Sequence, residues 1–178
     1  GDSNKVSWNL VDQNAIGVGV SGSGNALRGG TVQANSSHGV EFTATATGNT
    51  LQGATVQQNG SNGITVAGSG NTVRDNSRVE QNAGHGIAVS GAGNTIKSNT
   101  AGSAGKGNGG DGVNVTAGGN LLDSNKSSAN LGAGFAISGG GAGDPNVLKG
   151  NQGNAGSSGS KTENTGGEYV LLNGVRST

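Results

Sequence analysis

The chain has 178 residues, with ten basic and ten acidic residues and no formal net charge at pH 7. This balance gives no general case for binding nucleic acid. The complete lack of cysteine excludes disulfides, thiol nucleophiles and thiolate metal sites. No apolar run of about 18 residues occurs, so the sequence predicts no membrane-spanning helix.

An asparagine followed two positions later by an aliphatic residue recurs at nearly regular intervals. The seven copies of this first column are Asn4, Asn25, Asn49, Asn71, Asn94, Asn120 and Asn146. Successive copies lie 21 to 26 residues apart, a repeat length typical of solenoid proteins. The aliphatic residues are Val6, Leu27, Leu51, Val73, Ile96, Leu122 and Leu148. We expect them to form one row of a narrow core.

Two further columns of the repeat are rich in asparagine and glycine. The second column, five positions after the first, is Asn9, Gly30, Ala54, Asn76, Asn99, Asn125 and Asn151. The third column is Asn14, Asn35, Asn59, Asn82 and Asn130. Because Asn and Gly adopt left-handed backbone conformations at low cost, we expect the second column to mark left-handed corners. Stacked asparagine side chains are also expected to form hydrogen-bonded ladders.

Short segments with alternating apolar residues complete each repeat. Six of them have the form Gly-Φ-x-Φ, where Φ is apolar: residues 17–20, 39–42, 63–66, 86–89, 112–115 and 134–137. A second set is centred on the aliphatic residue of the first column, and a third carries Val11, Val32, Val56 or Val79. The alternation predicts strands whose Φ residues point inward. Three strands per repeat predict one coil of a parallel β-helix, paired with the next coil at about 4.8 Å.

The signals Gly-x-Gly-Asn-Thr-Φ and Asn-x-x-x-Gly-Φ-x-Φ, over residues 1–151, resemble the right-handed parallel β-helix repeats of the pectin-lyase-like superfamily. The resemblance implies an all-β, right-handed parallel β-helix solenoid of about seven coils of 21–26 residues, each with three short strands. We expect one domain over residues 1–178, with regular coils over 1–151 and a less regular C-terminal coil over 152–178. Residues 99–111 are expected to bulge as a corner loop, and residues 168–172 to form a last strand.

The residue before each strand glycine is the main candidate for a site. Successive repeats place His38, Asn62, His85 and Asp111 there, on one edge of the stacked coils, where His38 can pair with Glu41 and His85 with Asp111. Two interpretations stay open: solvated corner residues, or a sugar-contacting or acid–base site. Polysaccharide-cleaving enzymes on this fold need converging carboxylates. Here Glu41 is the one acid at the outward x position of the six Gly-Φ-x-Φ segments.

Residues 84–89 and 95–97 resemble the Gly-His-Gly-Φ-x-Φ and Arg-Ile-Lys motifs of polygalacturonases. The Asn-Thr-Asp and Asp-Asp motifs that supply the catalytic carboxylates in those enzymes have no counterpart, since residues 61–65 contain no acid and no Asp-Asp pair occurs. The turns at 107–111 and 140–144 resemble calcium-binding Gly/Asp turns but hold one Asp each, fewer than calcium normally needs. We therefore expect no catalytic residue, no metal ion and no cofactor.

Four bases follow the core aliphatic residues on the outer side of the predicted strands: Arg28, Arg74, Lys97 and Lys149, called the basic face below. This face fits docking of acidic glycans such as polyuronates, and it equally fits a solvated surface that keeps the rod soluble. Aromatic residues on which sugar rings stack are nearly missing, because only Trp8 and Tyr169 qualify, at opposite ends of the chain.

The leading functional hypothesis is a non-catalytic structural or adhesive solenoid of an extracellular or cell-surface protein. Its partners are expected to be copies of itself, stacked end to end into a fibre, or the remainder of a larger β-helix, because open coil ends expose unpaired strand edges. The alternative is a carbohydrate-active module of the lyase, hydrolase or epimerase type, or a module that binds an acidic polysaccharide. Nucleic acid and membrane are not expected partners.

Overall fold

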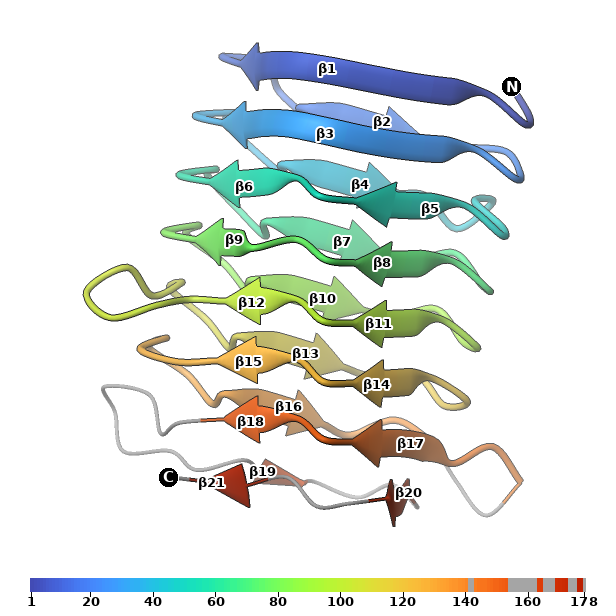
Figure 1. Ribbon diagram of the computed structural model, residues 1–178, viewed down its shortest axis with the longest axis vertical. Helices are drawn as coiled ribbons and strands as arrows, with labels where there is room; N and C mark the ends of the chain where they lie inside the picture. Colours follow the sequence, from blue (N-terminus) through green and yellow to red (C-terminus); the bar gives the residue numbers. More distant parts are fainter. Residues whose placement is uncertain (141–142, 154–162, 165–168, 173–175, 178) are drawn as a thin grey trace.

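The computed structural model describes residues 1–140, 143–153, 163–164, 169–172 and 176–177, with side chains described up to residue 153. These residues form strands, turns and bends without a helix. The described chain accordingly contains no helix long and apolar enough to cross a membrane. Figure 1 shows the strands stacked in successive rows, each row one coil. The predicted all-β solenoid with parallel sheets is confirmed.

Two parallel sheets face each other across the core (Figure 1). The front sheet, with two strand positions per coil, contains β1 (Lys5–Asp12), β3 (Ala26–Gln33), β5 (Thr50–Gln52), β6 (Thr55–Gln57), β8 (Thr72–Arg74), β9 (Arg78–Glu80), β11 (Thr95–Lys97), β12 (Thr100–Ala101), β14 (Leu121–Asp123), β15 (Lys126–Ser127), β17 (Asn146–Lys149), β18 (Gln152–Gly153), β20 (Tyr169–Leu172) and β21 (Arg176–Ser177). The back sheet contains β2 (Val18–Val20), β4 (Val40–Phe42), β7 (Ile64–Val66), β10 (Ile87–Val89), β13 (Val113–Val115), β16 (Phe135–Ile137) and β19 (Glu163–Asn164).

The strand register matches the repeat read from the sequence. The aliphatic residues of the first column pair with one another through seven successive coils, from Val6 opposite Leu27 to Leu122 opposite Leu148. In coils one and two the two front strand positions fuse, so β1 and β3 each run for eight residues. Six coils have all strand positions described with their side chains, and β17 to β19 belong to a seventh.

The core is a narrow stack of aliphatic residues, which explains why so few apolar residues suffice. Inward residues of both sheets are almost fully buried, and Phe42 and Phe135 are the largest of these side chains. The glycine before each back-sheet strand lets the corner approach the neighbouring coil. A Cβ atom at Gly63 would lie 2.6 Å from Nδ2 of Asn82 and 2.8 Å from Cγ1 of Val79. A larger residue there would therefore push adjacent coils apart.

Buried asparagines connect the corners of successive coils, as predicted. In the third column the Oδ1 atom of Asn82 accepts hydrogen bonds from the backbone amide of Asn59 at 3.1 Å and from its Nδ2 at 2.9 Å. The Nδ2 atom of Asn82 donates to the Val56 carbonyl at 3.1 Å and to Oδ1 of Asn108 at 2.9 Å. Each of these asparagines thus satisfies backbone and side-chain groups that the corner would otherwise bury unpaired.

Asn108 belongs to the third column, although the sequence pattern did not place it there. It is buried, and its Oδ1 accepts from the Asn82 amide at 3.1 Å. The irregular loop before it obscures its position in the repeat. Figure 1 shows this loop projecting beside β12, as expected for the longer connection. Within the loop, Ser103 and Lys106 form an isolated antiparallel bridge.

The predicted left-handed corners are displaced by one residue. Apart from Gly30, with φ 31°, second-column residues are not left-handed, whereas the residue before an asparagine of any column frequently is. The non-glycine cases have φ between 52° and 59°: Ser3, Gln13, Ala34, Gln58, Asp75, Gln81, Ser98, Ser124 and Ala129. Asparagine therefore occupies the columns for its side-chain amide, which bonds the next coil, and not for its backbone freedom.

Removing one amide from the middle of the third column tests this role. Asn82→Ala leaves the buried amide of Asn59 and the Oδ1 of Asn108 each without one partner, so we expect a loss of about 2–4 kcal/mol in the free energy of unfolding. Urea denaturation followed by circular dichroism measures it. Asn14→Ala is the matched control, because Asn14 is exposed and its Nδ2 bonds only the nearby Asp12 carbonyl. Equal losses for both variants would contradict the ladder account.

Candidate functional site

The stacked coils bring His38, Asn62, His85 and Asp111 onto one edge, named the edge column here. Each residue precedes the glycine before a back-sheet strand, and each belongs to a successive coil. The Oδ1 atom of Asn62 accepts the backbone N–H of His85 at 2.9 Å. The Nδ1 atom of His85 accepts the N–H of Asp111 at 2.9 Å, and Oδ1 of Asp111 accepts the N–H of Ala133 at 2.8 Å. From Asn62 to Asp111 the edge column is therefore a fourth ladder, built from different kinds of acceptor.

The two expected pairs on this edge have different outcomes. Nδ1 of His85 lies 3.2 Å from Oδ2 of Asp111, so these two residues do meet. The expected His38–Glu41 pair does not form among the described residues. Nδ1 of His38 instead lies 3.3 Å from Oγ1 of Thr65, the register partner of Glu41 in the next coil. Thr65 also accepts a hydrogen bond from Nδ2 of Asn62 at 3.3 Å.

One nitrogen of His85 faces two groups of Asp111 that compete for it. The backbone N–H needs a lone pair on Nδ1, whereas a hydrogen bond to the carboxylate needs a proton there. When Nδ1 is unprotonated, it accepts the hydrogen bond from the backbone N–H of Asp111. When Nδ1 is protonated, it would instead donate a hydrogen bond to the Asp111 carboxylate. The ladder geometry at 2.9 Å is the shorter of the two contacts. It is also the one repeated at Asn62 and Asp111.

The Asp111 carboxyl has a pKa below its ordinary value. The hydrogen bond with His85 is the largest cause, burial acts in the opposite direction, and the Ala133 amide, the Asn114 side chain and a charge on His85 lower the pKa further. The Ala133 amide and the Asn114 Nδ2, 3.0 Å from Oδ2, carry their protons at every pH. These two donors therefore act to lower the pKa of Asp111 whether or not the His85 ring is protonated.

Two of the four cations of the basic face, Arg74 and Lys97, are paired with acids. Arg74 Nη1 lies 3.1 Å from Oδ2 of Asp75, which also accepts from Gln52 at 3.2 Å. Lys97 Nζ lies 3.1 Å from Oδ2 of Asp123, its register partner in the next coil. Hydrogen bonds from Ser124 and then Lys97, with the charges of Lys97 and Lys149, hold the pKa of Asp123 below its usual value, whereas burial acts in the opposite direction.

Only Arg28 and Lys149 of the basic face make no ion pair with a described residue. They belong to coils two and seven, so at about 4.8 Å per coil they are roughly 24 Å apart. A short acidic sugar cannot contact both. The face therefore offers two separate cations on a surface of mixed charge, and only an extended polymer can span them.

Glu80 is a buried charged residue that the sequence analysis missed. Its side chain is 3% exposed, and Oε2 accepts from Oγ of Ser103 at 2.8 Å while Oε1 lies 3.7 Å from Nζ of Lys106. Both partners come from the projecting loop, so Glu80 ties that loop to the preceding coil. The sequence did not indicate that Glu80 is buried, because the equivalent residues of the two preceding coils are Gln33 and Gln57 and not acids.

Metal ligation has no support in the described geometry. Within the described residues, no group of three or more His, Cys, Asp or Glu side chains is arranged to hold a metal ion. In the edge column, one acceptor atom each of Asn62, His85 and Asp111 already bonds a backbone amide. The turn at 140–144 lies partly outside the described residues.

The fold defines a parallel β-helix solenoid, and comparison with known families agrees. The chain belongs to the right-handed beta helix region family, which matches residues 43–173. Comparison with curated proteins gives no match. Among solved structures, the chain is similar to the periplasmic alginate epimerase AlgG, with a TM-score of 0.65 and 16% identity. The match covers 95% of this chain and 40% of that one, and at this identity it shows a shared fold alone.

Acid stability tests the role assigned to Asp111. Because its pKa is lower in the folded chain than the unfolded value of about 3.9, its ionised form stabilises the fold above that pH. This contribution is lost as the pH falls through the folded pKa. Asp111→Asn keeps an oxygen acceptor for the Ala133 amide, as Asn62 does for His85, so we expect near-native stability at pH 7 and a flatter decline between about pH 5 and 2.

Urea titrations at several pH values measure this difference. Asp111→Ala is the comparison variant, because it removes the acceptor altogether and should cost about 1–2 kcal/mol at neutral pH. An Asp111→Asn variant whose stability declines with acid as steeply as the parent would contradict the assignment.

Proposed function

We propose that this chain is a non-catalytic structural or adhesive solenoid of an extracellular or cell-surface protein, and that its open coil end joins another β-helical end to lengthen the rod. The observation that carries the proposal is the edge column. Its acceptors, the Oδ1 of Asn62, the Nδ1 of His85 and the Oδ1 of Asp111, bond backbone amides of the next coil. Groups used in this way hold the corner and are poorly placed to exchange protons with a substrate.

The spacing of carboxylates supports the same proposal. Glycoside hydrolysis normally uses two carboxyl groups about 5–10 Å apart on one face. Glu41 lies in a row that continues through Thr65, Ala88, Asn114 and Ala136 to Glu163. The sequence pattern had placed Glu41 as the one acid of this row, but Glu163 of β19 is a second one, five coils away and roughly 24 Å from it at the strand spacing. Asp111 is the nearest acid of the edge column, three coils from Glu41, roughly 14 Å at the strand spacing. Acids at this separation do not form a catalytic pair.

A second candidate function, a carbohydrate-active or acidic-glycan-binding module, is favoured by one observation. Arg28 and Lys149 extend from the basic face without an ion-pair partner among the described residues. The fold shared with an alginate epimerase is compatible with an acidic polymer as ligand. Binding through these two cations would need a long polyuronate chain and would weaken strongly with added salt.

A polyuronate panel with matched variants separates the two functions. We expect no turnover of alginate or polygalacturonate by the parent chain, with or without calcium, as measured by reducing-end release, by unsaturated products and by NMR for epimerisation. His85→Asn should fold as stably as the parent within about 1 kcal/mol, because Asn62 performs the same bonding in the neighbouring coil.

Reproducible turnover that is lost in both His85→Asn and Glu41→Gln would overturn the non-catalytic proposal. Binding without turnover, lost in Arg28→Ala/Lys149→Ala and retained in Lys97→Ala, would favour the glycan-binding module instead. The Lys97 variant is the matched control because Lys97 is already paired with Asp123.

A further inference from the structure

A second set of cations runs along the front sheet, one strand position away from the basic face. Arg78 begins β9, Lys126 begins β15, and Thr100 lies between them at the start of β12. The pairing of β12 with β9 sets Thr100 opposite Arg78, and its pairing with β15 sets Thr100 opposite Lys126. We name these three residues the outer row. Its two cations are two coils apart, roughly 10 Å at the strand spacing.

The outer row alternates between charged and uncharged residues, and the alternation continues on both sides. Thr55 pairs with Arg78 at one end, and Gln152 pairs with Lys126 at the other. The register position beyond Gln152 belongs to Arg176. A basic residue therefore occupies every second coil from Arg78 to Arg176. The basic face lacks this spacing, because two of its cations belong to adjacent coils.

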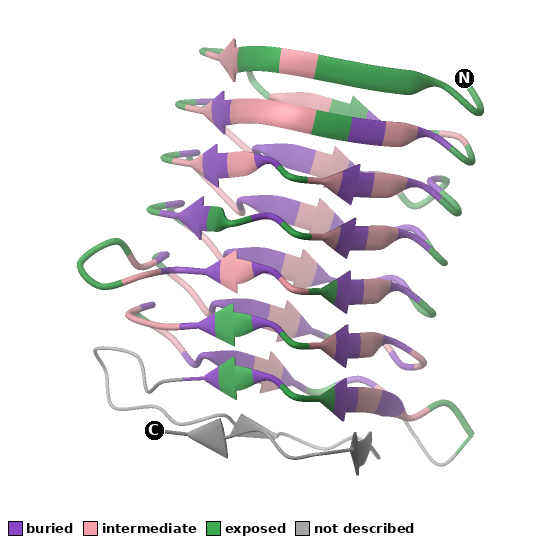
Figure 2. Ribbon diagram, viewed as in Figure 1, coloured by how far each residue is buried: buried purple, intermediate pink, exposed green. Residues whose placement is uncertain are grey.

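The side chains of the outer row are available to a ligand. Both cations are exposed, and neither makes an ion pair with a described residue. Figure 2 shows the exposed starts of β9 and β15 on either side of the half-buried start of β12. The Thr100 hydroxyl also has no hydrogen-bond partner among the described residues. Two free cations and a free hydroxyl thus lie in line along the solenoid axis.

The acids nearest to the outer row do not neutralise it. Glu80 follows Arg78 by two residues on β9, but its side chain is only 3% exposed. Its carboxylate is occupied by Ser103 and Lys106 of the projecting loop. In Figure 1 this loop extends sideways beyond the end of β12, away from the start of that strand. On the neighbouring strand position, the acids pair with cations of the basic face.

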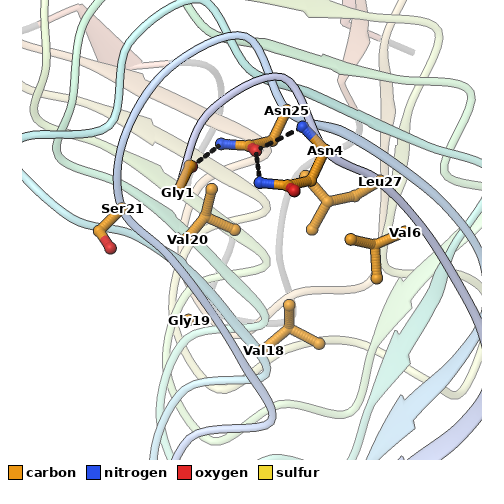
Figure 3. A pocket seen from close by; sticks show the side chains of 9 residues that line it. All are labelled: Gly1, Asn4, Val6, Val18, Gly19, Val20, Ser21, Asn25 and Leu27. Atoms are coloured by element: carbon orange, nitrogen blue, oxygen red, sulfur yellow. Dashed lines mark hydrogen bonds between the residues drawn. The ribbon is translucent and has the colours of Figure 1, made fainter.

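The outer row lies on the open surface of the sheet and not in a recess. Figure 3 shows one recess, of about 260 Å³, lined by Val18, Val20 and Leu27 among others in the first two coils. A second recess, of about 380 Å³, lies between the projecting loop and Leu131. Neither contains a residue of the outer row. An open row of this kind suits an extended polymer better than a compact molecule.

The spacing of the cations determines which polymer fits. One sugar of an extended polysaccharide is about as long as one coil spacing, so a chain laid along the solenoid places successive sugars opposite successive coils. Two coils then correspond to a disaccharide. A polymer with one anionic group per disaccharide sets its charges opposite Arg78 and Lys126. It sets an uncharged sugar opposite Thr100, whose hydroxyl both donates and accepts hydrogen bonds.

We propose that the outer row binds a linear polysaccharide that carries one anionic group per disaccharide, aligned with the solenoid axis. The inference rests on the adhesive part of the proposed function, for which it supplies a ligand, and it uses residues separate from the basic face. A polymer with a charge on every sugar fits less well, because half of its charges would face uncharged residues. Exposed cations contribute little one by one, so binding needs several disaccharides and weakens with added salt.

Hyaluronan, in which uronates alternate with uncharged sugars, is the probe for this ligand class. Fluorescence anisotropy with end-labelled hyaluronan oligosaccharides at low ionic strength should show binding that weakens as sodium chloride is added. Arg78→Gln and Lys126→Gln should each raise the dissociation constant about threefold, and the double variant about tenfold. Arg28→Gln is the matched control, because it removes an exposed, unpaired cation from the basic face and should leave the dissociation constant unchanged.

An exchange of two residues tests the spacing separately from the charge. Lys126→Thr/Thr100→Lys keeps the number of cations but brings them into adjacent coils. This variant should lose as much affinity for hyaluronan as Lys126→Gln does. Its affinity for polygalacturonate, which has a charge on every sugar, should rise relative to that for hyaluronan. Urea denaturation with the parental midpoint checks that the variant folds.

Absence of hyaluronan binding would overturn the proposal, and so would parental affinity in either the exchanged variant or Arg78→Gln/Lys126→Gln. Tighter binding of polygalacturonate than of hyaluronan through the same two cations would contradict the predicted spacing. These outcomes are separate from the test of the proposed function. Polyuronate turnover lost on mutation of His85 and Glu41 would remove the non-catalytic role and leave the outer row standing. Loss of hyaluronan binding would leave the edge column as described.

Discussion

The structure depends on the hydrogen bond between a corner side chain and a backbone amide of the neighbouring coil. A coil of 21–26 residues makes several sharp corners, and strand pairing alone cannot satisfy the backbone groups that those corners bury. Buried asparagines, with their amide oxygen and two amide protons, bond neighbours on both sides, as Asn82 does between Asn59 and Asn108. The aliphatic row supplies burial, and the asparagine columns determine where each coil turns and how it stacks.

The edge column extends this interaction to residues that are usually associated with chemistry. His85 and Asp111 resemble a catalytic pair when they are considered alone, since an imidazole nitrogen lies 3.2 Å from a carboxylate. Their position between Asn62 and Ala133 in a continuous series of amide acceptors gives them a different role. The lowered pKa of Asp111 comes first from its hydrogen bond with His85 and then from the Ala133 amide and the Asn114 side chain, against burial, and structural contacts of this kind lower the pKa of a carboxyl as catalytic ones do.

Sequence periodicity was sufficient to predict the solenoid, its coil length and its register, because the aliphatic and asparagine residues of each column recur every 21 to 26 residues. It was insufficient where geometry depends on a single residue. The left-handed positions, such as Asp75 and Ser98, have no common side chain, and the prediction had placed the left-handed conformation at the second-column asparagine that follows each of them. Asn108 was not assigned to the third column, because the loop before it changes the spacing from the preceding asparagine. The ion pair of Lys97 with Asp123 could be predicted only with the coil register in hand. Asp75, which pairs with Arg74, lies at a corner and not among the residues that follow the core aliphatic row.

The most direct test of the central claim is native-state hydrogen exchange at the corner amides, resolved by NMR. If side-chain acceptors hold the corners, the amides of Asp111 and Ala133 on the edge column should exchange as slowly as the amide of Asn59 in a buried ladder. The exposed loop residue Ala104 supplies the fast reference. Exchange of Asp111 and Ala133 at the rate of Ala104 would show that these side chains do not hold the backbone, and the structural account of the edge would fail.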